Sequence, residues 1–241
     1  MVGDMTTALI TGGNKGIGHA IAEGLGALGW SVGIGARDDA RREDAVAKLK
    51  AAGVDAFGVP LDVTDDASVA AAAQLLAAHG GLDVLVNNAG ITGGMPQNPT
   101  AIDPATLLRV VDTNVVGVLR VTNACLPLLV KSDHPRVVVV SSSVGSLTLQ
   151  TTPGSFVGPI SGAYAPSKTF LNALIIQYVK DLEGSNILMN AGCPGFVSTD
   201  LNGHHGTRTP EQGAAIAIKL ATLPDDGPTG TYSDDAGPIA W

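Results

Sequence analysis

The stretch Thr11-Gly12-Gly13-Asn14-Lys15-Gly16-Ile17-Gly18 decides the fold of this chain. A short apolar run, residues 6–10, precedes it, and apolar residues at helical spacing follow it, which predicts a strand, a glycine-rich turn and a helix. The glycines permit a tight turn, a close approach of the main chain to a pyrophosphate, and close packing of the helix on the strand. The free N–H groups at the start of the helix favour phosphate. We interpret the stretch as a dinucleotide-binding turn; a purely structural turn is the alternative.

Composition favours a globular α/β protein over one that binds nucleic acid or membranes. The chain has 241 residues, of which 45% are hydrophobic and 31 are glycine, and this length predicts one domain over residues 1–241. A net charge of −8 disfavours nucleic acid and anionic membranes as partners. No apolar run approaches the ~18 residues of a membrane span. Residues 1–4 lack signal-peptide features, which predicts a cytoplasmic protein with Cys125 and Cys193 reduced.

Strand-like and helix-like patterns alternate along the whole chain. Strands are expected at 6–10, 31–36, 54–61, 82–86, 136–140, 186–192 and 229–233. Helices are expected between them, including one continuous helix over about 105–129 and another over 164–182. Residues 147–163 form an irregular segment rich in Thr, Gly and Pro. This alternation predicts a doubly wound parallel sheet of about seven strands with helices on both faces.

The end of the second predicted strand indicates which dinucleotide binds. An acidic residue there binds the 2′-hydroxyl of NAD, whereas arginine suits the 2′-phosphate of NADP. Arg37 follows this strand, and Lys15 and Arg41 add positive charge, although residues 38–39 are acidic. We therefore favour NADP(H). The alternative is that Arg37, Arg41 and Arg42 form only the solvated start of a helix.

Tyr164 and Lys168 have the spacing of a catalytic pair. Four residues apart on a predicted helix, they lie on one face, where the ammonium can lower the tyrosine pKa from ~10 towards ~7. The phenol can then give a proton to a carbonyl oxygen, or take one from an alcohol. The fifth strand delivers the serines 141–143 to the sheet edge where ligands bind, and Ser142 would hydrogen-bond the same oxygen. A surface Tyr/Lys pair is the alternative.

Five motifs follow one another in a fixed order along the chain. They are T-G-x-x-x-G-x-G at 11–18, N-N-A-G at 87–90, a serine after the fifth strand, Y-x-x-x-K at 164–168 and P-G at 194–195. Together they resemble the short-chain dehydrogenase/reductase family over essentially the whole chain. The resemblance implies a Rossmann-type fold and a catalytic tetrad of Asn114, Ser142, Tyr164 and Lys168. Ser142 is preferred because the family's S-x-x-G spacing leads to Gly145, and Ser141 and Ser143 remain alternatives.

The resemblance also implies which residues bind the cofactor. Lys168 would bind the nicotinamide ribose, Asp62 the adenine and Thr199 the carboxamide; capping of the next helix is the alternative for Asp62. The complete set is Gly12, Asn14, Lys15, Gly16, Ile17, Gly18, Arg37, Asp62, Val63, Asn88, Ala89, Gly90, Tyr164, Lys168, Pro194, Gly195, Val197 and Thr199. Residues 11–18, 36–38, 202–204 and 237–241 are similar to the NADPH-dependent carbonyl reductases of the family.

These patterns predict an NADPH-dependent enzyme that reduces a ketone or aldehyde reversibly, with Tyr164 as acid and base. A non-catalytic dinucleotide-binding redox sensor is the alternative. The substrate pocket is expected at residues 92–98, 143–163 and 196–210, whose low charge suits an apolar carbonyl compound. The insertion at about 147–163 separates Ser142 from Tyr164 further than in many members and crowds a helix surface used for dimerisation, so both a homo-oligomer and a monomer are compatible with the sequence. His204 and His205 are not interpreted as metal ligands.

Overall fold

The computed structural model describes residues 5–94, 97–155 and 157–241. The N-terminal residues 1–4, residues 95–96 in the predicted pocket wall and residue 156 in the insertion lie outside the described ranges. Within those ranges, none of the helices combines the length and the apolar character needed to span a bilayer.

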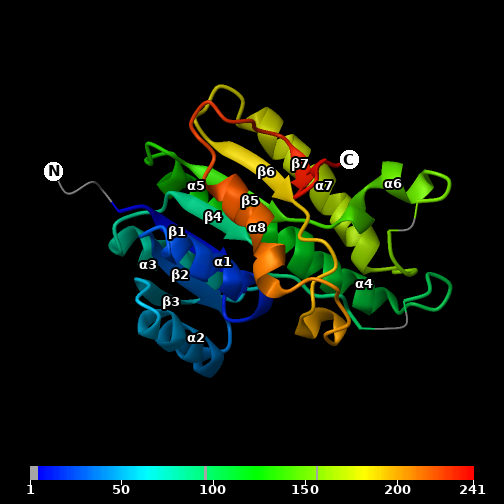
Figure 1. Cartoon of the computed structure of the whole chain (residues 1–241), viewed down its shortest axis with the longest axis horizontal. Coiled ribbons are helices and arrows are strands. Elements are labelled where there is room, and N and C mark those ends of the chain that lie inside the picture. The colour runs from blue at the N-terminus through cyan, green and yellow to red at the C-terminus, as the bar shows by residue number, and fades with distance from the viewer. Residues whose placement is uncertain (1–4, 95–96, 156) are drawn as a thin grey trace.

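A single eight-stranded sheet organises the protein, with the strand order β3-β2-β1-β4-β5-β6-β7-β8 (Figure 1). Its strands are β1 (Thr7–Thr11), β2 (Ser31–Ala36), β3 (Ala56–Pro60), β4 (Val84–Asn87), β5 (Arg136–Val140), β6 (Leu188–Gly192), β7 (Tyr232–Asp234) and β8 (Gly237–Pro238). All neighbouring pairs are parallel except β7 and β8. The doubly wound parallel sheet is thus confirmed, and the two-residue β8 makes eight strands instead of about seven.

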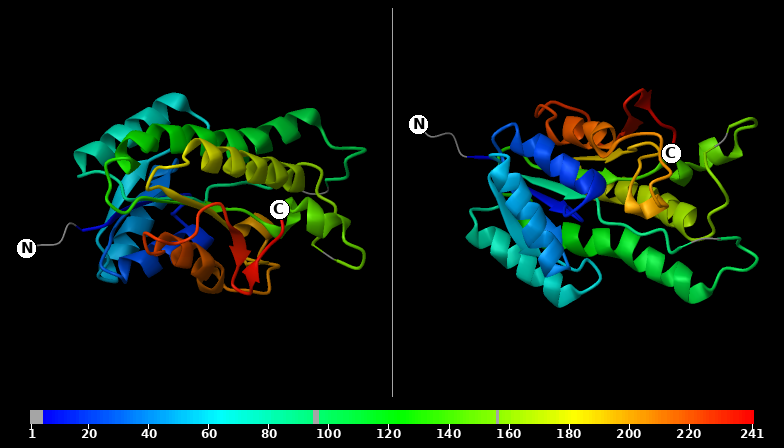
Figure 2. Two further views of the ribbon diagram at one scale, coloured as in Figure 1. Left: turned by 90° about the horizontal axis from the view of Figure 1, so that it is seen from above. Right: turned by 60° about the horizontal axis from the view of Figure 1, so that its bottom comes forward.

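Helices cover both faces of the sheet and give three layers (Figure 2). One face carries α1 (Gly16–Gly26), α2 (Asp39–Ala51) and α8 (Pro210–Ala221). The other carries α3 (Asp66–Ala78), α5 (Gly117–Leu129) and α7 (Tyr164–Asp181), with α4 (Pro104–Val111) leading into α5. The short α6 (Leu147–Thr151) and the chain before α4 project together from one end of the molecule.

The central strand β5 shows why the sheet needs helices on both sides. Val137 and Val139 belong to the core beneath α3, α5 and α7, whereas Val138 and Val140 belong to the core beneath α1 and α8. Full burial of each valine contributes about 1.5–3 kcal/mol. The β-branched run therefore anchors the strand firmly from both faces, and the serines that follow it are held in a fixed place.

Two segments differ from the sequence prediction. The expected continuous helix over 105–129 is divided by a π-helical turn, Asp112–Val116, which contains the buried Asn114. Such turns are frequent at functional sites. In the segment expected to be irregular, α6 forms because the Ser146 hydroxyl accepts a hydrogen bond from Leu149 N at 3.1 Å and caps its first turn.

Cys125 and Tyr178, two residues of the core beneath α5 and α7, resist ionisation. Burial raises the pKa of Cys125 from 9.0 to about 12. Burial, together with the carboxylate of Asp181, raises the pKa of Tyr178 from 10.0 to about 12. Between these pairs of values each of the two groups keeps its proton in the native protein and loses it in the unfolded chain, so each contributes a fall in the free energy of unfolding as pH rises.

We expect denaturant unfolding midpoints to decline once the pH exceeds about 10.5, because below that pH the lowered pKa of Lys168, about 8 instead of 10.5, makes stability rise with pH and opposes the effect of Cys125 and Tyr178. The Tyr178→Phe variant removes one of the two groups, so the slope of unfolding free energy against pH should be smaller in the variant than in the parent. The measurement is equilibrium unfolding in urea from neutral pH to pH ~11. Equal slopes for the two proteins would contradict the assignment of Tyr178.

Candidate active site

The glycine-rich turn joins β1 to α1 at the carboxyl edge of the sheet, and two of its glycines have left-handed backbone angles. The φ angles are +65° at Gly12 and +53° at Gly16. At Gly18 a Cβ atom would lie only 2.4 Å from the Gly12 carbonyl oxygen, closer than any side chain permits. Asn14, Lys15 and Ile17 complete the turn between the strand and the helix. The backbone is thus drawn in tightly at the N-terminus of α1, as a site for pyrophosphate requires.

Asn88, in the loop after β4, holds this turn in place. Its Nδ2 atom donates to the carbonyl oxygens of Thr11 at 2.9 Å and Gly12 at 3.2 Å. The Thr11 hydroxyl accepts hydrogen bonds from the backbone N–H groups of Asn88 and Ala89, each at 2.9 Å. Gly90 lies beside Asn114, whose Oδ1 would be 3.3 Å from a Cβ at position 90. Asn88 and Ala89, which the sequence analysis assigned to the cofactor site, therefore contact the glycine-rich turn directly.

The charged residues after β2 have different environments. Arg37 is exposed and forms no ion pair with any other residue that the structure describes. Arg41 is 3.7 Å from the Asp38 carboxylate. Arg42 is buried and donates to the Ala36 carbonyl oxygen at 3.2 Å. The interpretation of all three arginines as a solvated helix start is therefore wrong for Arg42.

Asp62 and Val63 follow β3 on the same edge. Hydrogen bonds from the Thr64 side chain and backbone, with a smaller contribution from the charge of Arg37, lower the pKa of Asp62. Asp65 caps α3, since its Oδ1 accepts from the Ala67 N–H at 2.8 Å. Asp65, and not Asp62, is therefore the cap of α3. The Asp62 carboxylate lies near Arg37. Val63 is buried.

Ser142, Tyr164 and Lys168 come together where β5 ends and α7 begins. The Ser142 side chain is near enough to the Tyr164 hydroxyl to lower the pKa of the phenol. The Lys168 Nζ atom donates to the Val140 carbonyl oxygen at 2.8 Å and lies 5.7 Å from the centre of the Tyr164 ring. Ser141 points elsewhere, because its hydroxyl donates to Asn172 Oδ1 at 2.5 Å. Among the three serines, Ser142 is the one whose side chain acts on the pKa of Tyr164 within the described residues.

The pKa values of the pair differ from the expectation drawn from their spacing. Burial raises the pKa of Tyr164 to about 12, and the nearby Ser142 side chain offsets only part of this effect. Burial lowers the pKa of Lys168 to about 8. A lysine that is itself desolvated carries its charge less readily, so it does not pull the phenol pKa down to ~7. The phenol is consequently protonated at neutral pH.

Asn114 connects the π-helical turn to the catalytic helix. Its Oδ1 accepts from the Ile91 N–H at 2.8 Å, and its Nδ2 donates to the Ile91 carbonyl oxygen at 2.9 Å and to the Ser167 hydroxyl at 3.0 Å. Ser167 in turn donates to the Tyr164 carbonyl oxygen at 2.7 Å. The asparagine thus fixes the backbone of the loop after β4 against the first turn of α7.

The segment after β6 closes the site opposite the glycine-rich turn. Gly195, after Pro194, has a φ of +76°, and Val197 is buried. A Cβ at Gly16 would lie 3.2 Å from Thr199 Cγ2, so the two segments face each other. Lys15 also reaches across, and its Nζ lies 2.7 Å from an oxygen of Asp200.

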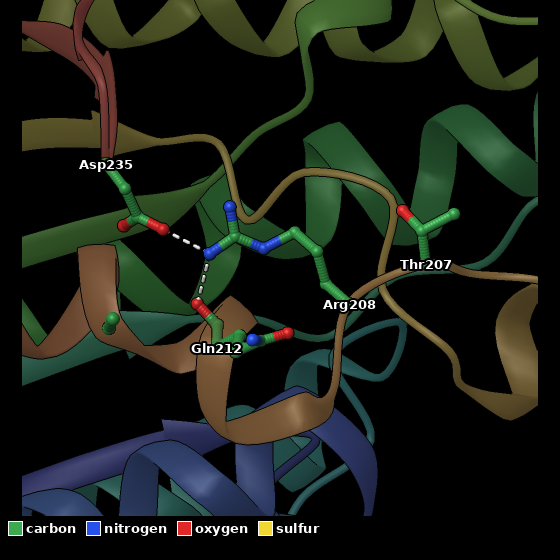
Figure 3. Close-up of a pocket in the computed structure, with 5 residues that line it drawn as sticks. Thr207, Arg208, Gln212 and Asp235 are labelled. Atoms are coloured by element: carbon green, nitrogen blue, oxygen red, sulfur yellow. Dashed lines mark hydrogen bonds and ion pairs between the residues drawn. The ribbon is translucent and has the colours of Figure 1, made fainter.

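Arg208 borders a shallow pocket of about 490 Å³ beside this segment. Its guanidinium lies between the carboxylate of Asp235 and the first turn of α8, and it donates to Asp235 and, at 2.5 Å, to the Gln212 carbonyl oxygen (Figure 3). The positive charge of Arg208 is therefore neutralised within the protein, which makes it a poor receptor for an anionic substrate.

Three residues at the site were not identified from sequence. Ser167 lies inside the Y-x-x-x-K motif, so its position in the motif was an available signal. Asp200 and Gln97 carried no signal, because each acts on a segment far away in the chain. Gln97 lies in the loop before α4 and contacts the start of α7.

Comparison with known proteins agrees with this geometry. Residues 6–209 match the family model described as short chain dehydrogenase. The chain is 34% identical to "Carbonyl reductase [NADPH] 1" of Mus musculus over 97% of its length and 98% of the relative's. It is 32% identical to "Short-chain dehydrogenase/reductase 1" of Saponaria officinalis, covering 93% of this chain and 92% of that one. Salutaridine reductase from Papaver somniferum superimposes with a TM-score of 0.83 at 29% identity, over 94% of this chain and 99% of the other. On this sequence match and this fold, the chain belongs to the short-chain dehydrogenase/reductase family.

Proposed function

We propose that this protein is an NADP(H)-dependent oxidoreductase that reduces a ketone or aldehyde to an alcohol and can catalyse the reverse reaction. The observation that carries the proposal is the convergence of Ser142, Tyr164 and Lys168 at the end of β5, next to the glycine-rich turn. Bound NADPH supplies the hydride that the carbonyl carbon accepts.

Tyr164 is suited to give the proton that completes the reduction. Because burial raises its pKa to about 12, the hydroxyl is protonated at neutral pH and can donate to the carbonyl oxygen as negative charge develops there. Ser142 donates a second hydrogen bond to that oxygen. The ammonium of Lys168 offsets the charge left on the phenolate until solvent returns a proton.

The residues around the turn fit a dinucleotide phosphate. The N–H groups at the start of α1 would bind the pyrophosphate, and the absence of side chains at Gly12, Gly16 and Gly18 would leave room for it. We propose that Arg37, which is exposed and follows β2, contacts the 2′-phosphate of NADP. Relatives named as NADPH carbonyl reductases and a Pseudomonas aeruginosa RhlG/NADP complex at 31% identity, TM-score 0.83, support this cofactor.

An apolar carbonyl compound is the substrate class that suits the rim of the site. Leu147 and Ile160 in the insertion, and Phe196 and Leu201 after β6, are large apolar side chains exposed to solvent. The charge of Arg208 is already paired with Asp235. These surroundings offer apolar contacts and little to hold an anion.

The test incubates the purified protein with NADPH and a panel of apolar ketones and aldehydes. The loss of NADPH absorbance measures the rate, and the alcohol formed is then identified. We expect alcohol in amounts equal to the NADPH consumed. Protein that binds NADPH but reduces no member of the panel would support the redox-sensor alternative instead.

Arg37 gives a direct test of the cofactor preference. Arg37→Ala removes a charge-assisted contact of about 1.5–3 kcal/mol, so NADPH should bind roughly 10- to 100-fold more weakly while NADH binding is unchanged. The matched control is Arg41→Ala, because Arg41 is paired with Asp38 and should matter little. Fluorescence titration measures both affinities. An equal loss for NADH and NADPH would show that Arg37 does not contact the 2′-phosphate.

A further inference from the structure

The catalytic helix α7 begins without a cap of its own. Its capping position is Ala163, which has no side chain that can accept a hydrogen bond. Tyr164 is the first helical residue, so the orientation of its side chain depends on the backbone of that first turn. The free N–H groups at a helix start need acceptors, and an uncapped end loses stability.

Gln97, from the loop before α4, provides the missing acceptor. Its Oε1 atom lies 3.2 Å from the backbone nitrogen of Ala163 and 3.2 Å from that of Tyr164, and both N–H groups donate to it. The Ser161 hydroxyl donates to the same oxygen at 2.8 Å. The backbone is joined as well, because Gly162 N donates to the Gln97 carbonyl oxygen at 2.8 Å. A residue 67 positions away therefore caps the helix that carries the phenol.

The other end of the same amide holds the loop after β4. The Gln97 Nε2 atom donates to the carbonyl oxygens of Thr92 and, at 2.7 Å, Gly94. The side chain is 2% exposed, and both ends of its amide are bonded. Rotating the amide by 180° would set its N–H groups against the N–H groups of α7, so only one orientation satisfies all partners.

We propose that Gln97 is a positioning residue, which sets the place of the Tyr164 hydroxyl relative to Ser142 by fixing the first turn of α7. The inference rests on the proposed function, because it concerns the geometry of that reaction. Ser142 lies two residues after the central strand β5, whereas Tyr164 is the first residue of α7. The distance between the Ser142 and Tyr164 hydroxyl groups therefore varies whenever the first turn of α7 moves. A displacement of ~1 Å at a reacting group can lower a rate about 100-fold.

Two substitutions distinguish the role of the Gln97 side-chain oxygen from that of its nitrogen. Gln97→Met keeps the length of the side chain and loses every side-chain hydrogen bond, so kcat should fall roughly 10- to 100-fold with NADPH affinity unchanged. Gln97→Glu keeps an oxygen facing the N–H groups of α7, where a negative charge is also favourable, whereas its second oxygen faces the carbonyl oxygens of Thr92 and Gly94, which costs stability. We expect the glutamate variant to recover most of the lost kcat.

Asn190→Leu is the matched control for loss of a buried amide. Asn190 joins two segments away from the site, since it donates to the Pro228 carbonyl oxygen at 2.8 Å and accepts from Thr231 N at 2.9 Å. This variant should lower the unfolding temperature without lowering kcat. If it lowers kcat as much as Gln97→Met does, or if the glutamate and methionine variants have equal kcat, Gln97 serves only stability and the proposal fails.

Hydrogen exchange gives a readout that needs no turnover. The N–H groups of Ala163 and Tyr164 should exchange about 10-fold or more faster in Gln97→Met than in the parent or in Gln97→Glu. If the parent reduces no carbonyl compound, the proposed function fails, and exchange alone decides whether Gln97 holds the start of α7. Unchanged exchange in Gln97→Met would overturn the proposal regardless of activity.

Discussion

Tyr164→Phe is expected to lower kcat for carbonyl reduction by about 1,000-fold, within the range typical of the loss of a general acid. The phenylalanine ring fills the same space, so the packing against β5 and Lys168 remains, and only the proton donor beside Ser142 is removed. NADPH affinity should stay within about threefold of the parent, because the lost group acts on the reacting oxygen. Steady-state kinetics and a fluorescence titration measure the two quantities.

Tyr178→Phe is the control on the same helix. The Tyr178 hydroxyl donates to Asn123 Oδ1 at 2.6 Å, within the core beneath α5. Its removal costs a buried hydrogen bond of about 1 kcal/mol and should leave kcat unchanged. A Tyr164→Phe protein as active as the Tyr178→Phe protein would refute the assignment of Tyr164 as the acid.

Gly18→Ala should weaken NADPH binding by about 100-fold or more, because the new methyl group forces the turn out of place. The Cβ would lie 2.4 Å from the Gly12 carbonyl oxygen and 2.5 Å from Asn88 Nδ2. Neither atom can move freely, since Asn88 Nδ2 is itself bonded to Thr11 and Gly12. Calorimetric titration with NADPH measures the loss.

Gly53→Ala distinguishes this steric effect from the general strain of replacing glycine. Gly53 has a φ of +84°, and a Cβ atom there would have no neighbour within 4 Å, so alanine costs about 1–2 kcal/mol of strain and no collision. The variant should be less stable and bind NADPH normally. Normal NADPH binding by Gly18→Ala would mean that the turn can relax and that the close contact does not shape the site.

The parts of the fold that could be predicted from sequence are those set by local patterns. The apolar run of β5 and the glycines before α1 each identify their element within a few residues. Helical periodicity alone does not indicate the π-helical turn, because the turn accompanies the hydrogen bonds of Asn114 with Ile91, 23 residues away. The cap of α6 by Ser146 is local and could have been found, since a serine before a short apolar run favours a helix start.

In the candidate site, too, the features set by local motifs could be predicted and those set by distant contacts could not. The sequence motifs singled out Ser142, Tyr164 and Lys168, and in the structure these three side chains lie near one another. The pKa directions were not predictable from spacing, because burial of the pair depends on the whole fold. Gln97 has no motif, since its role depends on a contact across 67 positions.

The short strand β8 matters for a property unrelated to catalysis. It pairs with β7 at the end of the sheet, where Ile239 N donates to the Tyr232 carbonyl oxygen at 2.7 Å. Trp241 packs on Tyr232 with ring centres 5.1 Å apart. An uncovered edge strand offers unpaired backbone groups to strands of other molecules. Residues 237–241 thus cover the edge of β7. Protein that loses them by proteolysis would expose this edge and tend to aggregate by strand pairing with other copies.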